Sequence, residues 1–136
     1  RRSPLKGVDI DMNRTPDALP AMAVVGAFAE GTTRLLNVQQ ARKKETDRIA
    51  VMAKELAKMG VQTEELQDGL VIHHCPRLKS AVLNGHEDHR IVMALSLALM
   101  SIEEGGAVDT AEAINVTFPE YVNLMQRLGA RMKLSE

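Results

Sequence analysis

Charged residues gather in the segment 42–48, Arg-Lys-Lys-Glu-Thr-Asp-Arg, which carries six charges in seven residues at the start of a predicted helix. The amino-terminal end of a helix attracts anions through its free N–H groups and its dipole. Acidic residues are common there, whereas Lys43, Lys44 and Arg48 are expected mainly where an anion binds. Lys44 and Arg48 are four residues apart and would share a helix face, with Glu45 three residues before Arg48. The segment predicts an anion site, although a solvated charged face would explain the same pattern.

A second charged helix start lies at residues 87–90, Glu-Asp-His-Arg, directly before a long apolar run. Arg90 would therefore lie at the mouth of a buried helix, and a guanidinium suits bidentate binding of a carboxylate or phosphate. The alternative is that Asp88 caps the helix while Arg90 reaches solvent. Two helix starts that carry cations in matching places favour the anion site.

Asp17 ends the turn 11–17, Asp-Met-Asn-Arg-Thr-Pro-Asp, which follows a predicted strand. It can cap the next helix, or its carboxylate can accept a proton from a substrate hydroxyl as a general base. His73, His74 and Cys75 suggest a metal site less well, because adjacent strand residues point to opposite faces and no second Cys completes a ligand set. We expect no metal, and the sequence has no Gly-rich phosphate loop.

The elements that must position these residues are marked by Gly and Pro and by apolar periodicity. They follow the order β-α-β-α-β-β over residues 6–75, and the order begins again over residues 78–136, one strand short. Such an internal repeat is itself evidence about the fold. We expect helices over residues 17–29, 43–59, 89–104 and 118–128. We expect strands over residues 6–10, 32–36, 61–66, 70–74, 78–83, 107–109 and 131–134, with 112–116 also extended.

The helices are more apolar than the strands. Residues 18–29 and 91–100 are almost free of polar side chains, as in helices that are buried all round, whereas the strand segment 63–65 is polar. In a doubly wound fold the strands would be the buried elements. The expected fold is therefore α/β (α+β) with helices inside and sheets outside. The helix over 43–59 has an apolar stripe formed by Ile49, Met52, Leu56 and Met59. Its solvent side is expected to carry Lys54, Glu55 and Lys58.

The amino-acid composition limits the classes of protein to which the chain could belong. The chain has 136 residues, 45% hydrophobic and 26% charged, enough for one compact domain with an aliphatic core because aromatics are only 2%. Its net charge of −1 does not favour a nucleic-acid partner. The single Cys75 excludes an intramolecular disulfide and favours a cytoplasmic setting. The apolar run over 91–102 is too short for a membrane span, and no signal peptide is visible. Because the chain does not begin with Met, we expect a piece of a longer protein.

Four blocks of sequence resemble the EPSP synthase family, in that family's order and spacing. The most specific is Lys-Glu-Thr-Asp-Arg-Ile at 44–49, followed by Glu-Leu and Lys-Met-Gly within 55–60. The others are 11–17, the Asp-His-Arg block at 88–94, and Phe-Pro-Glu-Tyr at 118–121. The related UDP-N-acetylglucosamine enolpyruvyl transferases share the fold and the chemistry but lack the 44–49 block. The chain is identified as a member of the EPSP synthase family.

The resemblance implies a reaction of the shikimate pathway of aromatic amino acid biosynthesis. The carboxyvinyl group of phosphoenolpyruvate moves to the 5-hydroxyl of shikimate 3-phosphate, and phosphate is released. Asp17 would hold the attacking hydroxyl and act as its base. Lys44 would lie between both substrates as a general acid or base, and Glu45 would take part in proton transfer at the methylene carbon. No metal or organic cofactor is implied.

The resemblance also implies binding roles. Arg48 and Arg90 would bind phosphoenolpyruvate, and Lys44 and Asp17 would contact shikimate 3-phosphate. Gln40 aligns with an amide that touches the shikimate ring, where the family often has Asn. Val116 stands where some members carry a substrate-contacting Lys, so that contact is lost.

Length is the main departure from the family. Full-length members have two lobes and roughly three times this number of residues, well beyond one ordinary domain. The chain would be two of the three units of the carboxy-terminal lobe, without the amino-terminal lobe that completes the site, and we expect it to be inactive alone. The alternative from another class is a non-catalytic α/β module that binds small anions or a partner.

Overall fold

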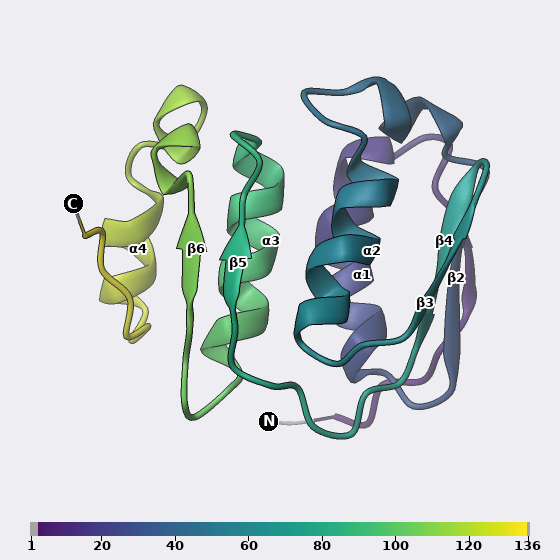
Figure 1. Cartoon of the computed structure of the whole chain (residues 1–136), viewed down its shortest axis with the longest axis horizontal. Helices are drawn as coiled ribbons and strands as arrows, with labels where there is room; N and C mark the ends of the chain where they lie inside the picture. Colours follow the sequence, from purple (N-terminus) through teal and green to yellow (C-terminus); the bar gives the residue numbers. More distant parts are fainter. Residues whose placement is uncertain (1–2, 136) are drawn as a thin grey trace.

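The computed structural model describes residues 3–135 and contains two β-sheets on either side of a layer of helices (Figure 1). The larger sheet has the strand order β1-β2-β4-β3, with β1 and β2 parallel and the other neighbours antiparallel. Its strands are β1 (Asp9–Asp11), β2 (Thr32–Leu36), β3 (Thr63–Leu66) and β4 (Gly69–His73). The smaller sheet is a parallel pair, β5 (Val82–Asn84) and β6 (Ala107–Asp109).

The longer helices fill the space between the two sheets. In Figure 1, α1 and α2 lie against the larger sheet, and α3 lies behind β5 and β6. α1 contacts α2, α3, β2 and β4, so it is the centre of the molecule. The helices are α1 (Leu19–Phe28), α2 (Arg48–Lys58), α3 (His89–Met100) and α4 (Tyr121–Arg127). In the described part of the chain, three short 3₁₀ segments precede α1, α2 and α4: η1 (Pro16–Ala18), η2 (Gln39–Lys43) and η3 (Ala111–Val116).

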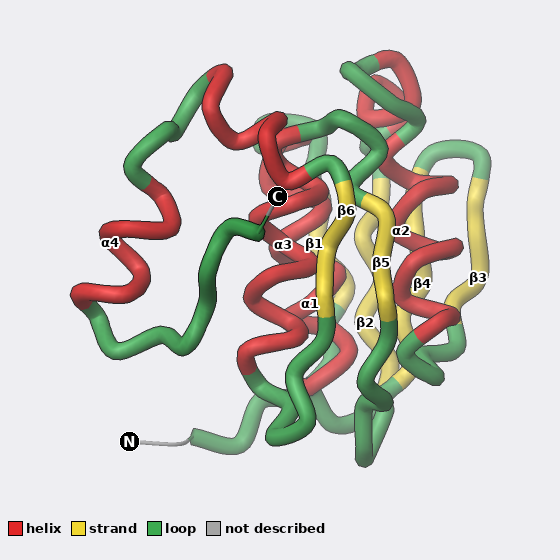
Figure 2. Tube along the Cα trace, turned by 60° about the vertical axis from the view of Figure 1, so that its left-hand side comes forward, coloured by secondary structure: helices red, strands yellow, loops and turns green. Residues whose placement is uncertain are grey.

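The arrangement of helices inside and sheets outside is confirmed. Leu19, Ala23 and Ala27 of α1 have no exposed surface, and Leu95 and Ala98 of α3 are equally enclosed. Figure 2 shows α4 on the outer side of α3, away from α1 and α2. Among residues 3–135, no helix combines the length and the apolar character needed to cross a membrane.

The stripe predicted on α2 is correct, but its solvent face is not. The apolar stripe is buried in the common core: Ile49, Met52, Leu56 and Met59. Lys54 and Lys58 are exposed as expected, whereas Glu55 has no exposed surface. The prediction for Glu55 was wrong because residues 84–86, distant in sequence, lie over this side chain and bind it.

All four helices are shorter than predicted, since α1 is Leu19–Phe28 and α4 is Tyr121–Arg127. α2 begins at Arg48 rather than at residue 43, because the Asp47 side chain accepts a hydrogen bond from Ala50 N (3.1 Å) and caps the helix there. Residues 39–43 form η2 instead. α3 ends at Met100 rather than at residue 104.

The second half of the chain departs further from the expected repeat. The segment 112–116 is part of the 3₁₀ turn η3 rather than extended. Within the described part of the chain, residues 131–134 form no strand. A strand requires a neighbouring edge to bind, and periodicity within a short segment does not show whether that edge is available.

Candidate active site

The side chain of Arg48 lies at the centre of a cluster of charged residues. Its side chain is only 1% exposed, and its guanidinium binds three carboxylates. Nε and Nη2 donate to the two oxygens of Asp88 (2.8 and 3.1 Å). Nη1 donates to Asp17 (2.9 Å), and Nη2 also donates to Glu45 (2.7 Å). Arg48 thus joins η1, the loop before α2 and the start of α3.

The Arg48–Asp88 contact holds two helix starts together. Arg48 is the first residue of α2, and Asp88 is the N-cap of α3, where it accepts from Arg90 N (3.0 Å). Thr46 Oγ1 also donates to Asp88 (3.1 Å). The cap at Asp88, which the sequence offered as the alternative to an anion site, is present, but Arg90 lies 3.9 Å from Asp17 as well. Sequence reasoning missed the Arg48–Asp88 ion pair, because no local spacing relates residues that lie 40 positions apart.

Asp17 is the point where the cations converge. Its carboxylate oxygens lie 2.9 Å from Arg48 Nη1, 3.5 Å from Lys44 Nζ and 3.9 Å from Arg90 Nη2. The alternative that Asp17 caps the first helix is wrong, because it lies inside η1, and neither η1 nor α1 has a side-chain cap. The structure therefore brings Asp17, Lys44, Glu45, Arg48 and Arg90 together on one face.

The reason for this convergence differs in part from the prediction. Lys44 and Arg48 do not share a helix face, because residue 44 precedes the first turn of α2. Lys44 reaches Asp17 from the loop instead. The expected contact between Glu45 and Arg48 is present at 2.7 Å.

The other residues singled out from the sequence lie at the edge of this cluster or outside it. Gln40, on η2, donates to the backbone oxygen of Asn13 (2.9 Å), in the turn that leads to Asp17. Val116 is 81% exposed at the end of η3. His73 is hydrogen-bonded within the larger sheet, and residues 3–135 contain no group of three or more His, Cys, Asp or Glu side chains arranged to hold a metal.

The formal charges of the cluster balance, and the pKa values of Asp17, Asp88 and Arg48 are shifted in favour of their charged forms. Burial opposes ionisation of Asp17, but the positive charges of Lys44, Arg90 and Arg48 outweigh it and hold the pKa of this carboxyl below its ordinary value. Burial likewise opposes the charge of Asp88, yet its hydrogen bonds and ion pair with Arg48 lower its pKa. Burial disfavours the Arg48 cation, and the same pair with Asp88 raises the pKa of Arg48. An anion that binds Arg48 must therefore take the place of another carboxylate.

An incoming anion can replace a carboxylate at Arg48 only on the exposed side of the cluster. Asp88 is fully buried, whereas the side chains of Asp17 and Glu45 are 48% and 52% exposed. Lys44 and Arg90 are partly exposed beside them, at 31% and 42%. Asp88 can stay hydrogen-bonded to Arg48 while the exposed carboxylates of Asp17 and Glu45 move away. The geometry is suited to binding an anion at two or three cations, next to a carboxylate that can accept a proton.

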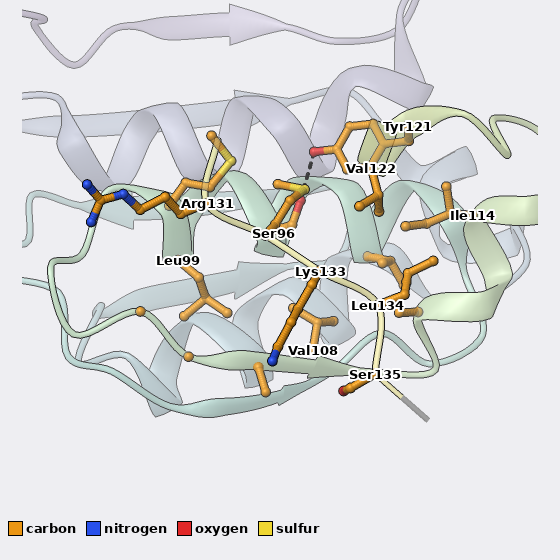
Figure 3. A pocket seen from close by; sticks show the side chains of 17 residues that line it. Ser96, Leu99, Val108, Ile114, Tyr121, Val122, Arg131, Lys133, Leu134 and Ser135 are labelled. Carbon is orange, nitrogen blue, oxygen red and sulfur yellow. Dashed lines mark hydrogen bonds between the residues drawn. The ribbon is translucent and has the colours of Figure 1, made fainter. Parts of the chain in front are cut away.

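A cavity of about 480 Å³ lies elsewhere, between α3, β6, η3, α4 and residues 131–135 (Figure 3). Its lining is mainly aliphatic, and Ser96 and Tyr121 share a hydrogen bond of 2.8 Å at its side. None of the six site residues predicted from the sequence lines it.

The family model described as "EPSP synthase (3-phosphoshikimate 1-carboxyvinyltransferase)" matches residues 1–125. The chain belongs to the EPSP synthase family. A relative from Acetivibrio thermocellus named "3-phosphoshikimate 1-carboxyvinyltransferase" is 57% identical over 132 residues, which are 97% of this chain and 31% of the relative. A relative of the same name from Ruminiclostridium cellulolyticum is 54% identical over 130 residues, 96% of this chain and 31% of its own length. The chain thus spans about a third of these EPSP synthase relatives.

Solved structures agree with the family assignment. An EPSP synthase from Acinetobacter baumannii superposes with a TM-score of 0.84 at 30% identity, over 98% of this chain and 32% of that one. The enolpyruvyl transferase NikO from Streptomyces tendae superposes with a TM-score of 0.76 at 23% identity, over 98% of this chain and 30% of that one, which shows a common fold. The predicted enolpyruvyl transferase fold is confirmed.

Proposed function

We propose that this chain forms most of the carboxy-terminal lobe of an enzyme that transfers the enolpyruvyl group of phosphoenolpyruvate to the 5-hydroxyl of shikimate 3-phosphate. The proposal rests mainly on one observation. Three cations, Lys44, Arg48 and Arg90, lie within 3.9 Å of the Asp17 carboxylate. Phosphoenolpyruvate carries a phosphate and a carboxylate, so it requires several cations, and the reaction requires an acceptor for the hydroxyl proton.

Phosphoenolpyruvate would bind at Arg48 and Arg90. Asp88 holds the Arg48 guanidinium from the buried side. Phosphoenolpyruvate would therefore bind Arg48 where the carboxylates of Asp17 and Glu45 now lie. Arg90, which is 42% exposed, supplies a second cation from the start of α3. Preorganised cations of this kind stabilise the charge of the transferred group without reorganisation during the reaction.

The reaction would proceed by addition and elimination. Asp17, ionised because its pKa is lowered by the neighbouring cations, accepts the proton of the 5-hydroxyl as its oxygen bonds to C2 of phosphoenolpyruvate. The methylene carbon C3 gains a proton, for which Lys44 and Glu45 are the nearby groups. Loss of a proton from C3 then restores the double bond, and the bond from C2 to the phosphate oxygen breaks. Gln40 would contact the shikimate ring from the η2 side.

An amino-terminal lobe would complete this site. The chain covers 31% of its relatives, and the charged cluster lies on an open face. A second lobe closing over it would supply further substrate contacts and exclude water, on which much of the rate enhancement depends. We therefore propose that the chain alone is inactive. We further propose that residues 6–75 and 78–136 are two repeats of one unit, and that the enzyme works in the cytoplasm.

The substrate requirement of the full-length enzyme tests this function. We expect phosphate release only when phosphoenolpyruvate and shikimate 3-phosphate are both present, and no release when UDP-N-acetylglucosamine replaces shikimate 3-phosphate. Release with the sugar nucleotide would assign the chain to the other branch of enolpyruvyl transferases. Binding of phosphoenolpyruvate without release in any combination would indicate a non-catalytic anion-binding module.

A further inference from the structure

A second buried carboxylate lies outside the charged cluster. Glu55 is on α2, about two turns beyond Arg48, and has no exposed surface. It accepts hydrogen bonds from Asn84 N (2.9 Å) and His86 Nε2 (3.0 Å), and from Lys58 Nζ at 2.8 and 3.0 Å. A buried carboxylate is costly unless it is paired. Three partners stabilise this one: Lys58 on α2, Asn84 at the end of β5, and His86 in the loop between β5 and α3.

That loop has an unusual backbone. His86 and Glu87 both adopt the left-handed conformation, with φ of 53° and 57°. Residues other than glycine rarely adopt this conformation, so surrounding contacts must hold it. Asn84 Oδ1 accepts from His86 N (2.7 Å), and Thr110 Oγ1 accepts from Glu87 N (3.0 Å).

Close packing fixes the loop from the other side. A Cβ on Gly85 would collide with the Val92 side chain and would lie 2.8 Å from Asp109 O and 2.9 Å from Thr110 Oγ1. The loop therefore lies pressed between β6 and α3, and the Glu55 carboxylate meets it on the side of α2.

The loop is held on α2 at two points. Glu55 binds it at residues 84 and 86, and Arg48 binds it at Asp88. Arg90 follows two residues later and approaches Asp17 from there. The position of the Arg90 guanidinium is thus determined by the path of residues 84–88.

We propose that Glu55 is a positioning residue that acts through His86 to set the β5–α3 loop, and hence the place of Arg90 in the anion site. The proposal rests on the function proposed above, in which Arg90 binds phosphoenolpyruvate. The two side-chain partners of Glu55 differ in their relation to Arg90. His86 belongs to the loop that leads to Arg90, whereas Lys58 lies on α2, far from Arg90 in the sequence, and is 37% exposed.

Steady-state kinetics of the full-length enzyme with His86→Ala, His86→Gln and Lys58→Ala test the proposal. We expect His86→Ala to raise KM for phosphoenolpyruvate about ten- to a hundredfold, because small displacements of a binding group have effects of this size. KM for shikimate 3-phosphate should change by less than about threefold, since its expected contacts lie on η1, η2 and the loop before α2. His86→Gln, which keeps an N–H donor for Glu55, should recover most of the loss.

Lys58→Ala is the matched control, because it removes the other side-chain partner of the same carboxylate. We expect it to leave both KM values within about twofold, because Lys58 lies on α2, is 37% exposed and does not contact the segment that leads to Arg90. The proposal is overturned if His86→Ala and Lys58→Ala give the same KM for phosphoenolpyruvate, or if His86→Ala raises both KM values equally. Should His86→Ala unfold at the assay temperature, Asn84→Ala, which frees His86 N alone, must give the same selective rise. Absence of the reaction in the unmodified enzyme would instead refute the proposed function.

Discussion

The guanidinium of Arg48 binds the carboxylate of Asp88 through two hydrogen bonds, of 2.8 and 3.1 Å, and neither side chain is more than 1% exposed. The planar fork of an arginine matches the two carboxylate oxygens, so the pair fixes direction as well as distance. Because the two residues begin α2 and cap α3, this one contact sets the two helix starts beside each other. The cations of the proposed anion site depend on that alignment.

Asp88→Ala should strongly destabilise the fold. The substitution leaves the Arg48 cation without its only fully buried partner and removes the cap of α3, so we expect a loss of about 3–5 kcal/mol in the free energy of unfolding. Urea unfolding followed by circular dichroism measures it. Asp9→Ala is the control, because Asp9 pairs with Arg34 on the surface at 3.2 Å and should contribute less than about 1 kcal/mol. Equal losses in the two variants would show that the buried pair stabilises the fold no more than the surface pair does.

Stability should fall in acid. The pKa of Asp88 is lowered from 3.8 in the folded chain, and the pKa values of Asp17 and Glu55 are lowered as well. A lowered native pKa means that the unfolded chain binds protons first as pH falls, so the stabilisation is complete above about pH 5 and is lost as pH falls through the native pKa values. Urea unfolding at a series of pH values measures this. A curve for Asp88→Ala that runs parallel to the unmodified one would contradict the assignment.

Local signals in the sequence predicted much of the fold. The strands Thr32–Leu36 and Ala107–Asp109 have the limits expected from the sequence, and the hairpin of β3 and β4 turns at Gln67 and Asp68, directly before Gly69. These features depend on β-branched composition and turn chemistry within a few residues. The burial of α1 and α3 was likewise readable, because a helix without polar side chains has no face for solvent.

The sequence-based predictions were wrong where residues distant in the sequence determine burial or local structure. Glu55 has the charge and spacing of a surface residue on α2, and only the approach of residues 84–86 makes it buried. The segment 43–47 is compatible with a helix by composition, but Asp47 caps α2 instead. Residues 131–134 have strand-like composition and form no strand in the described structure, because strand formation needs a partner edge.

The candidate site was predicted better than its internal contacts. Five of the residues chosen from sequence motifs lie together, although the motifs are up to about seventy residues apart. No local pattern in the sequence indicates that Arg48 is held by a buried carboxylate, or that three cations meet at Asp17 rather than Asp17 capping a helix. Catalytic roles for these residues, and for Gln40, stay predictions.

Arg42 fixes the other side of the loop that carries Lys44 and Glu45. Its guanidinium donates to Asp47 and Glu65, both at 2.8 Å. It also donates to two backbone oxygens of the β3–β4 turn, at 2.9 and 2.6 Å. The segment 43–46 therefore runs between two anchored points, the end of η2 and the cap of α2.

Arg42→Lys should destabilise the chain although it keeps the charge. An ammonium cannot reproduce four contacts of a planar fork, and we expect a loss of about 1.5–3 kcal/mol in the free energy of unfolding, from hydrogen bonds to charged groups. Thermal and urea unfolding measure the loss. Arg77→Lys is the matched control, because Arg77 is 86% exposed and contacts Glu104 at 3.4 Å. No difference between the two variants would mean that Arg42 is an ordinary surface residue.

Arg90 offers the most direct test of the central claim that the charged helix starts form one site for phosphoenolpyruvate. Its side chain is 42% exposed and lies 3.9 Å from Asp17, so Arg90→Ala should leave the fold intact, unlike a change at the buried Arg48. The measurement is kcat/KM for phosphoenolpyruvate in the full-length enzyme, with Arg77→Ala as the control. We predict a loss of at least about a hundredfold for Arg90→Ala, as for other preorganised groups that stabilise transferred charge, with an unchanged melting temperature. A loss no greater than that of Arg77→Ala would contradict the account.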